Sequence, residues 1–196
     1  MKFPLHITFK LIAFAPRITV RDADQKTILY IEQQVMALKE AVKVYDNEHD
    51  KNLLYSMHAN QIIDFGATYI FNDEKLNKEI GSVQQEGMRS LFQASYTVMN
   101  NSGKTLYQIK QTNPMIAILD SLINIIPFAE LISGFILHPE YHVTKIDKNE
   151  PLLVMKKKPS LFESHFEVDT LNDSNKDALL VLLSLLMIVQ LERNRG

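Results

Sequence analysis

The sequence contains no cysteine, and this absence removes several classes of function at once. Disulfides, thiolate metal sites and cysteine nucleophiles are all excluded, so stability has to come from packing. Glycine is scarce as well. The six glycines form no Gly-x-Ser-x-Gly elbow, no phosphate-binding loop and no dinucleotide fingerprint. We therefore expect neither an enzymatic activity nor a cofactor.

An excess of charge of one sign is also missing. The 21 basic and 23 acidic residues give a formal net charge of −2, which offers nucleic acid no global basic field. Residues 5–11 alternate apolar with polar side chains, unlike the unbroken core of an export signal, so we expect a cytoplasmic protein. A chain of 196 residues is long enough for one well-buried core, and we predict a single domain, 1–196.

What the chain does contain is a repeated phrase: a short alternating run, a polar turn with Asp or Asn, and a second apolar run. Alternation places one face of each strand inward, and Asp, Asn and Gly adopt the backbone conformations that reverse the chain. Each phrase therefore predicts a β-hairpin. The five predicted hairpins are Ile18–Ile31, Val42–Met57, Thr68–Val83, Ala94–Ile109 and Tyr141–Met155.

Two further strands are predicted near Leu5–Phe14 and Leu161–Val168. Because a lone hairpin is marginal in water, the hairpins and flanking strands must share one sheet of about twelve strands. A sheet of that size can close on itself, and closure removes its exposed edges. The predicted fold class is therefore mainly β, a closed antiparallel β-barrel.

The C-terminal segment breaks the alternating pattern. Asp173-Ser174 can cap a helix, and residues 178–189 form a run that is apolar on every side. The run is shorter than the roughly 20 apolar residues of a membrane span, and Asp177 and Gln190 bound it closely. We predict a helix over 174–191 that is buried inside the barrel, with a tilted membrane anchor as the alternative.

Several segments of the chain are typical of one family, and the resemblance covers nearly the whole chain. Its most specific parts are Ile18–Asp22, Tyr96–Asn100 with Gly103, and Ser164–Val168 leading into Asp177–Leu180. With these segments the chain resembles the tubby-like superfamily, which includes LURP-one-related proteins and phospholipid scramblases. In that family the last helix lies inside the barrel. The resemblance implies a binding or structural module, peripheral at a membrane or associated with phospholipid. Scramblase-like lipid handling is one alternative, although the cysteine-rich segment and proline-rich arm of scramblases are absent. A protein–protein interaction module with a helical dimer contact is the second alternative.

Two motifs superficially resemble metal sites. His138 and His142 are four residues apart, but Pro139 obstructs the helix that would align both rings, so we predict surface or strand histidines. Asp22 and Asp24 could begin a calcium loop, but the loop lacks glycine at its sixth position and glutamate at its twelfth. We predict a turn there, and no metal site in either place.

Lys156, Lys157 and Lys158 form the densest basic run of the chain. Two interpretations are open. The lysines could meet anionic lipid headgroups, each contributing about 1 kcal/mol near the surface. Alternatively, they mark a solvated strand end and protect an exposed sheet edge.

One segment, at about 114–139, has no counterpart in the hairpin pattern. Asn113-Pro114 is typical of a helix start and Pro127 ends or kinks that helix, so we predict a helical insertion. Its apolar stripe could pack as a lid, form a dimer contact or touch a membrane. The expected partner is membrane phospholipid or a protein, and not nucleic acid. The candidate contact residues are Met115, Ile118, Leu119, Leu122, Ile126, Phe128, Lys156, Lys157 and Lys158.

Overall fold

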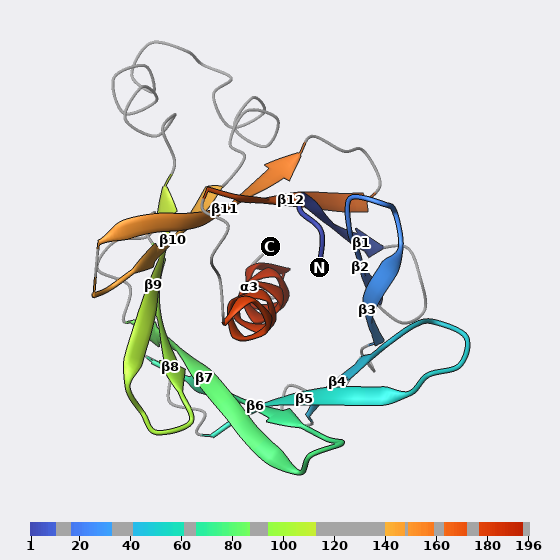
Figure 1. The fold of residues 1–196 in the computed structure, drawn as a ribbon, viewed down its shortest axis with the longest axis horizontal. Coiled ribbons are helices and arrows are strands. Elements are labelled where there is room, and N and C mark those ends of the chain that lie inside the picture. Colours follow the sequence, from blue (N-terminus) through green and yellow to red (C-terminus); the bar gives the residue numbers. More distant parts are fainter. Residues whose placement is uncertain are drawn as a thin grey trace, which may run out of the picture.

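The structure is a computed structural model that describes residues 1–10, 17–32, 41–60, 66–86, 94–112, 140–147, 149–158, 163–171 and 177–193. In this part of the chain, twelve antiparallel strands form a closed barrel, and a helix lies along its interior (Figure 1). The predicted fold class, a mainly β barrel of about twelve strands around a buried C-terminal helix, is confirmed. The predicted insertion at 114–139 lies outside the described residues.

The strands follow one another around the barrel in chain order, and β1 pairs with β12 to close it. The predicted hairpins are all confirmed, as β2–β3, β4–β5, β6–β7, β8–β9 and β10–β11. The elements are β1 (Leu5–Lys10), β2 (Arg17–Arg21), β3 (Thr27–Glu32), β4 (Val42–Tyr45), β5 (Leu53–Ala59), β6 (Thr68–Asp73), β7 (Lys78–Glu86), β8 (Ser95–Asn100), β9 (Thr105–Thr112), β10 (Glu140–Lys145), β11 (Glu150–Lys158), β12 (Glu163–Thr170) and α3 (Ala178–Arg193).

Side chains of Asp and Asn build the tight turns of these hairpins. The carboxylate of Asp22 accepts hydrogen bonds from the backbone N–H groups of Asp24 and Lys26, both at 3.1 Å. The side-chain oxygen of Asn100 does the same in the β8–β9 turn, where Gly103 adopts a φ of +77°. These side chains replace backbone partners in the reversal, which is why Asp and Asn recur there. The predicted turn at Asp22 and Asp24 is thus confirmed.

The interior of the barrel is filled by α3. All residues from Leu180 to Leu191 are buried, including Ser184, whose hydroxyl donates to the backbone carbonyl of Leu180 at 2.8 Å. Burial of each such leucine contributes about 1.5–3 kcal/mol relative to exposure. The helix therefore supplies one side of the hydrophobic core and the inward faces of the strands supply the other. The predicted helix bounds of 174–191 need correction. Asp177 lies in a turn, so the helix begins at Ala178 and not at 174, and it runs to Arg193, beyond the predicted end at 191. The predicted cap residues Asp173 and Ser174 lie outside the described residues.

Close contact between α3 and the barrel wall depends on Gly81 in β7. A Cβ atom at this position would lie 2.3 Å from the carbonyl oxygen of Met99 and 3.0 Å from Cδ1 of Leu180. The backbone of Gly81 also has a φ of +155°, which side-chain-bearing residues rarely adopt. Glycine is therefore required at this position, chiefly by the backbone of the neighbouring strand β8 and also by the packing of Leu180 from α3.

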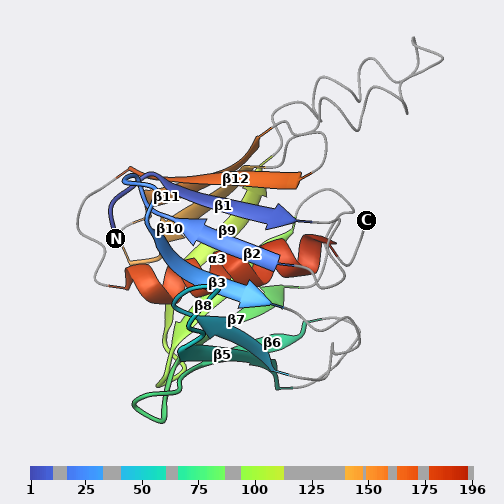
Figure 2. The ribbon, with the colours of Figure 1, turned by 90° about the vertical axis from the view of Figure 1, so that its right-hand side faces the viewer.

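The connections between strands are divided between the two ends of the barrel (Figure 2). The five hairpin turns and the start of α3 lie at one end, which we call the turn end. At that end the hydroxyl of Tyr107 donates to the carboxylate of Asp177 at 2.8 Å. Burial, followed by this carboxylate, raises the pKa of Tyr107 above its ordinary value. The remaining connections between strands leave from the opposite end, which we call the loop end.

Candidate functional site

The connections at the two ends differ in composition. Those at the turn end consist mainly of Asp, Asn, Glu and Lys, as in Asp22–Lys26 and Asp46–Asn52. Those at the loop end are rich in Leu, Ile, Phe, Met and Ala, and charged residues are sparse in them. Their sequences are LIAFAP (11–16), QQVMALKE (33–40), QIIDF (61–65), GMRSLFQ (87–93), NPMIAILDSLINIIPFAELISGFILHP (113–139) and PSLF (159–162). The connections whose flanking strand ends lie at the loop end are therefore the more apolar ones in sequence.

The longest of these apolar connections leaves from a well-defined place. Thr112 at the end of β9 and Glu140 at the start of β10 are direct register partners, so the strand ends that bracket 113–139 lie side by side. Glu140 is also the register partner of Lys156 in β11, and its Oε1 lies 3.7 Å from the Lys156 Nζ. The fold thus brings the lysine run next to the strand ends that carry the 113–139 connection. The predicted contact residues Met115, Ile118, Leu119, Leu122, Ile126 and Phe128 lie outside the described residues.

The three lysines of the run have different surroundings. Lys156 and Lys158 point away from the core, and Lys158 Nζ lies 2.7 Å from Glu167 Oε1 in β12. The hydrogen bond that Lys158 donates to the Glu167 carboxylate raises the pKa of Lys158 above its ordinary value. Lys157 belongs to the opposite face of β11, and its Nζ lies 5.8 Å from the ring centroid of the buried Phe166. The run is therefore not a patch of three parallel cations.

The interpretation of this run as a solvated strand end is confirmed for Lys158, which is exposed at the end of β11, but the interpretation that the lysines protect a sheet edge is wrong. β11 pairs with β10 on one side and with β12 on the other, so it is not an edge strand. The closed barrel leaves no edge here for lysines to protect. The alternative, contact with lipid headgroups, stays a prediction.

A second polar arrangement on the same wall was not predicted. On the outer face of β10, β11, β12 and β1, three glutamates each lie between one histidine and one lysine. The distances join a carboxylate oxygen to a ring or ammonium nitrogen. Glu140 lies 3.4 Å from His142 and 3.7 Å from Lys156, and Glu163 lies 3.5 Å from His165 and 3.8 Å from Lys10. Glu167 lies 4.0 Å from His6 and 2.7 Å from Lys158. We call these nine residues the histidine face.

The face is partly exposed to solvent. The three histidine side chains are between 36% and 42% exposed, so solvent protons reach each ring. His165 also forms a hydrogen bond with Thr8, 3.2 Å between Nδ1 and Oγ1. The sequence predicts part of this pattern. Two Glu–His pairs, Glu140 with His142 and Glu163 with His165, are each two residues apart, so both members of a pair lie on the same face of a strand. The lysine partners come from cross-strand register, which no local pattern shows.

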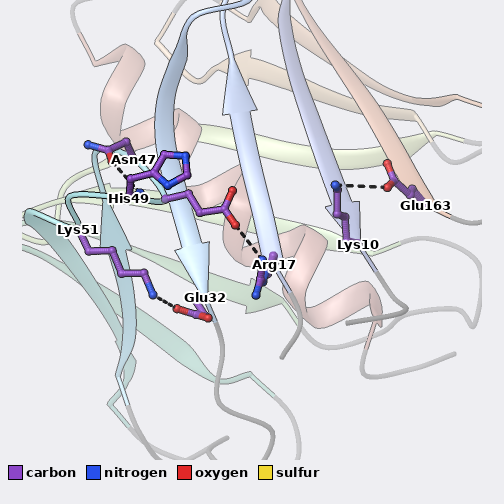
Figure 3. A network of polar contacts seen from close by, with 8 residues as sticks. Lys10, Arg17, Glu32, Asn47, His49, Lys51 and Glu163 are labelled. Atoms are coloured by element: carbon purple, nitrogen blue, oxygen red, sulfur yellow. Dashed lines mark hydrogen bonds and ion pairs between the residues drawn. The ribbon is translucent and has the colours of Figure 1, made fainter. Parts of the chain in front are cut away.

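The adjacent wall of the barrel has ion pairs without histidine (Figure 3). Arg17 in β2 contacts Glu48 at 2.8 Å, and Lys51 contacts Glu32 in β3. These pairs fasten the β4–β5 turn against the barrel wall, where the ring of Tyr30 is buried although it faces outward. The pair formed by Lys10 and Glu163, also drawn in Figure 3, lies where this wall meets the histidine face.

A fold of this kind can serve many functions, so similarity to other proteins matters here. No protein-family model, curated protein or solved structure matches the chain. The resemblance to the tubby-like superfamily therefore stays a prediction, whereas the barrel itself follows from the strand pairing. No helix in the described part of the chain combines the length and apolarity that crossing a bilayer demands.

The sites that could carry chemistry are few in the described residues. There, no three His, Asp or Glu side chains are grouped in a way that could hold a metal ion. His142 lies in β10, as the prediction of a strand histidine required, and His138 lies outside the described residues.

A hollow of about 390 Å³ at the turn end is lined by Asp73, Leu76, Lys78, Glu79, Ile80, Asn100, Asn101, Asp177, Leu179 and Leu180. This lining includes no serine, threonine or histidine that could act as a nucleophile or its base.

Proposed function

We propose that this protein is a non-enzymatic binding module of the tubby-like type, and that its loop end docks on the surface of a phospholipid membrane. The observation that supports the proposal is the segregation of apolar connection sequences to one end of the barrel. The interior of the barrel is occupied by α3, so it offers those side chains little room for burial. Removing apolar surface from water yields about 25 cal/mol per Å², and the hydrocarbon boundary of a bilayer can provide that burial.

The contact is peripheral, with the barrel held at the membrane surface. The strand ends nearest to the 113–139 connection carry Lys156 and Lys158, but Glu140 and Glu167 pair with them. Pairing reduces their attraction to anionic headgroups, so apolar burial provides most of the affinity at neutral pH. The polar turn end then faces away from the membrane.

The proposal is tested by flotation of the purified protein with phosphatidylcholine vesicles. Because Thr112 and Glu140 are register partners, a short Asn-Gly turn can replace residues 114–139 without altering the β9–β10 pairing. We expect the intact protein to float with the vesicles and the shortened protein to remain in the soluble fraction. A triple variant, Leu119→Asn, Leu122→Asn and Phe128→Asn, should weaken binding in the same direction.

The matched control changes three apolar side chains at the other end of the barrel. Leu76, Ile146 and Leu171 belong to the turn end and are 72%, 49% and 54% exposed. Their replacement by Asn should leave flotation unchanged. Equal binding by the intact and shortened proteins, or binding by neither, would refute the membrane role. Sedimentation of the same two proteins then shows whether the segment is a dimer contact.

A further inference from the structure

The charge of the histidine face depends on the protonation of its histidines. While the rings are neutral, the cations of Lys10, Lys156 and Lys158 balance the carboxylates of Glu140, Glu163 and Glu167. Histidine is the side chain whose ordinary pKa places its charge change between pH 5 and 8. Full protonation of His6, His142 and His165 therefore changes the net charge of the nine residues from zero to +3.

Each histidine is placed between groups that act on it in opposite directions. The acidic neighbours are Glu167, Glu140 and Glu163, which lie within 4.0 Å of His6, His142 and His165. The basic neighbours are the register partners Arg21 for His6, Lys110 for His142 and Lys158 for His165. Asp169, in β12, is a further acidic residue on this wall and pairs with Val154.

Protonation also changes the partners of the lysines. Each glutamate has one carboxylate to share between a lysine and a histidine, so a protonated ring competes with the lysine for it. The lysine side chains are between 44% and 58% exposed, so once released they can extend toward another anion. Acidification thus adds positive charge and frees existing positive charge on the same surface.

The face reaches the loop end of the barrel. Lys10 and Lys158 are the last residues of β1 and β11, and Glu140 and Glu163 are the first residues of β10 and β12. All four therefore lie at the end that carries the apolar connections. An anionic bilayer in contact with that end would lie next to these side chains.

We propose that the histidine face is a pH-dependent binding surface for anionic phospholipid. The inference rests on the proposed function, because it assigns to the membrane-facing end an electrostatic contact that adds to apolar burial. Each protonated histidine that reaches an anionic surface should strengthen binding about fivefold, which corresponds to about 1 kcal/mol. Attraction of this kind weakens with salt, whereas apolar burial does not.

The test is flotation at about pH 7.5 and about pH 5.5 with vesicles of phosphatidylcholine alone or mixed with phosphatidylglycerol. The phosphodiester of phosphatidylglycerol keeps its charge across this range, so a change in binding reports the protein. We expect acidification to strengthen binding to the mixed vesicles at least about fivefold and to leave binding to pure phosphatidylcholine unchanged.

Three sets of variants separate the histidine face from other causes. The triple variant His6→Gln, His142→Gln and His165→Gln should bind the mixed vesicles with the same affinity at both pH values. A triple lysine variant at these positions should bind them tightly already at neutral pH. The matched control, His49→Gln with His58→Gln, removes two histidines outside the face and should retain the full response to pH.

The outcomes distinguish this inference from the proposed function. Binding to mixed vesicles that is independent of pH, or a pH response that survives in the triple glutamine variant, would overturn the inference and leave the apolar contact intact. A pH response to mixed vesicles that persists after replacement of residues 114–139 would support the histidine face. If the shortened protein also still binds pure phosphatidylcholine as the intact protein does, the role of that segment is removed. Failure to bind any vesicle at either pH would overturn both.

Discussion

The substitution Leu183→Asp tests whether α3 is part of the barrel core. Leu183 is fully buried in the middle of the helix, and its neighbours Leu182, Leu185 and Leu186 are buried as well. The variant loses about 1.5–3 kcal/mol of apolar burial and also places a carboxyl group in a site without a hydrogen-bond partner, which costs several kcal/mol more. Since small domains are stable by about 5–15 kcal/mol, we expect most of the cooperative unfolding transition to disappear.

The measurement is urea denaturation followed by circular dichroism, with two control variants. Leu183→Met conserves volume and apolarity and should cost less than about 1.5 kcal/mol. Leu171→Asp introduces the same carboxyl at a residue that is 54% exposed, and its effect should stay within about 0.5 kcal/mol. Burial raises the pKa of the new carboxyl at position 183, so the damage should be least below about pH 4 and increase as the pH rises.

A soluble Leu183→Asp protein that unfolds cooperatively, with a free energy close to that of the unmodified chain, would refute this account of the core. In that case the helix would contribute little to the stability of the barrel, and the strands alone would form its core.

Two further predictions concern the barrel wall. Gly81→Ala forces a Cβ against the Met99 carbonyl of β8 and against Leu180 of α3, so it should destabilise the protein by more than about 1 kcal/mol in urea denaturation. Unchanged stability would contradict the described approach of β8 and α3 to this residue. The hydrogen bond from Thr97 lowers the pKa of Glu86, so the stability that it contributes is present above the ordinary glutamate pKa and is lost as the pH falls. In an NMR titration, Thr97→Val should raise the pKa of Glu86, whereas Thr97→Ser, which keeps the hydroxyl, should leave it lowered. If Glu86 titrates identically in Thr97→Val and in the unmodified protein, the contact is contradicted.

Most of the fold follows from local sequence patterns. Alternation and Asp or Asn turns predict the hairpins, because strand geometry has a period of two and reversals require particular side chains. The all-round apolarity of residues 178–189 predicts a buried helix, because only burial on every side suits it. Closure follows from the number of strands, since a sheet of this size removes its edges by pairing its first strand with its last.

The surface was less predictable, because it depends on which residues face one another across strands. The lysine run reads as one basic cluster in the sequence, but strand geometry sends Lys157 to one face and Lys156 and Lys158 to the other. The contact between His6 and Glu167 joins residues at opposite ends of the described chain. A β-bulge between Val143 and Thr144 also shifts the pairing of β10 with β11, and no simple repeat reveals such a shift.

The pairing of β1 with β12 has a consequence for how the chain folds. The hairpins form from neighbouring residues, but this last pairing brings together strands such as those of Thr8 and His165, which are 157 residues apart. Contacts over such separations slow folding, because the entropy of closing the chain must be lost before the contact stabilises anything. The helix that fills the interior also follows all twelve strands in the chain. Until β1 and β12 pair and α3 packs, the partly folded sheet has two unpaired edges and an uncovered apolar face. This open sheet is therefore the species most prone to aggregation during folding.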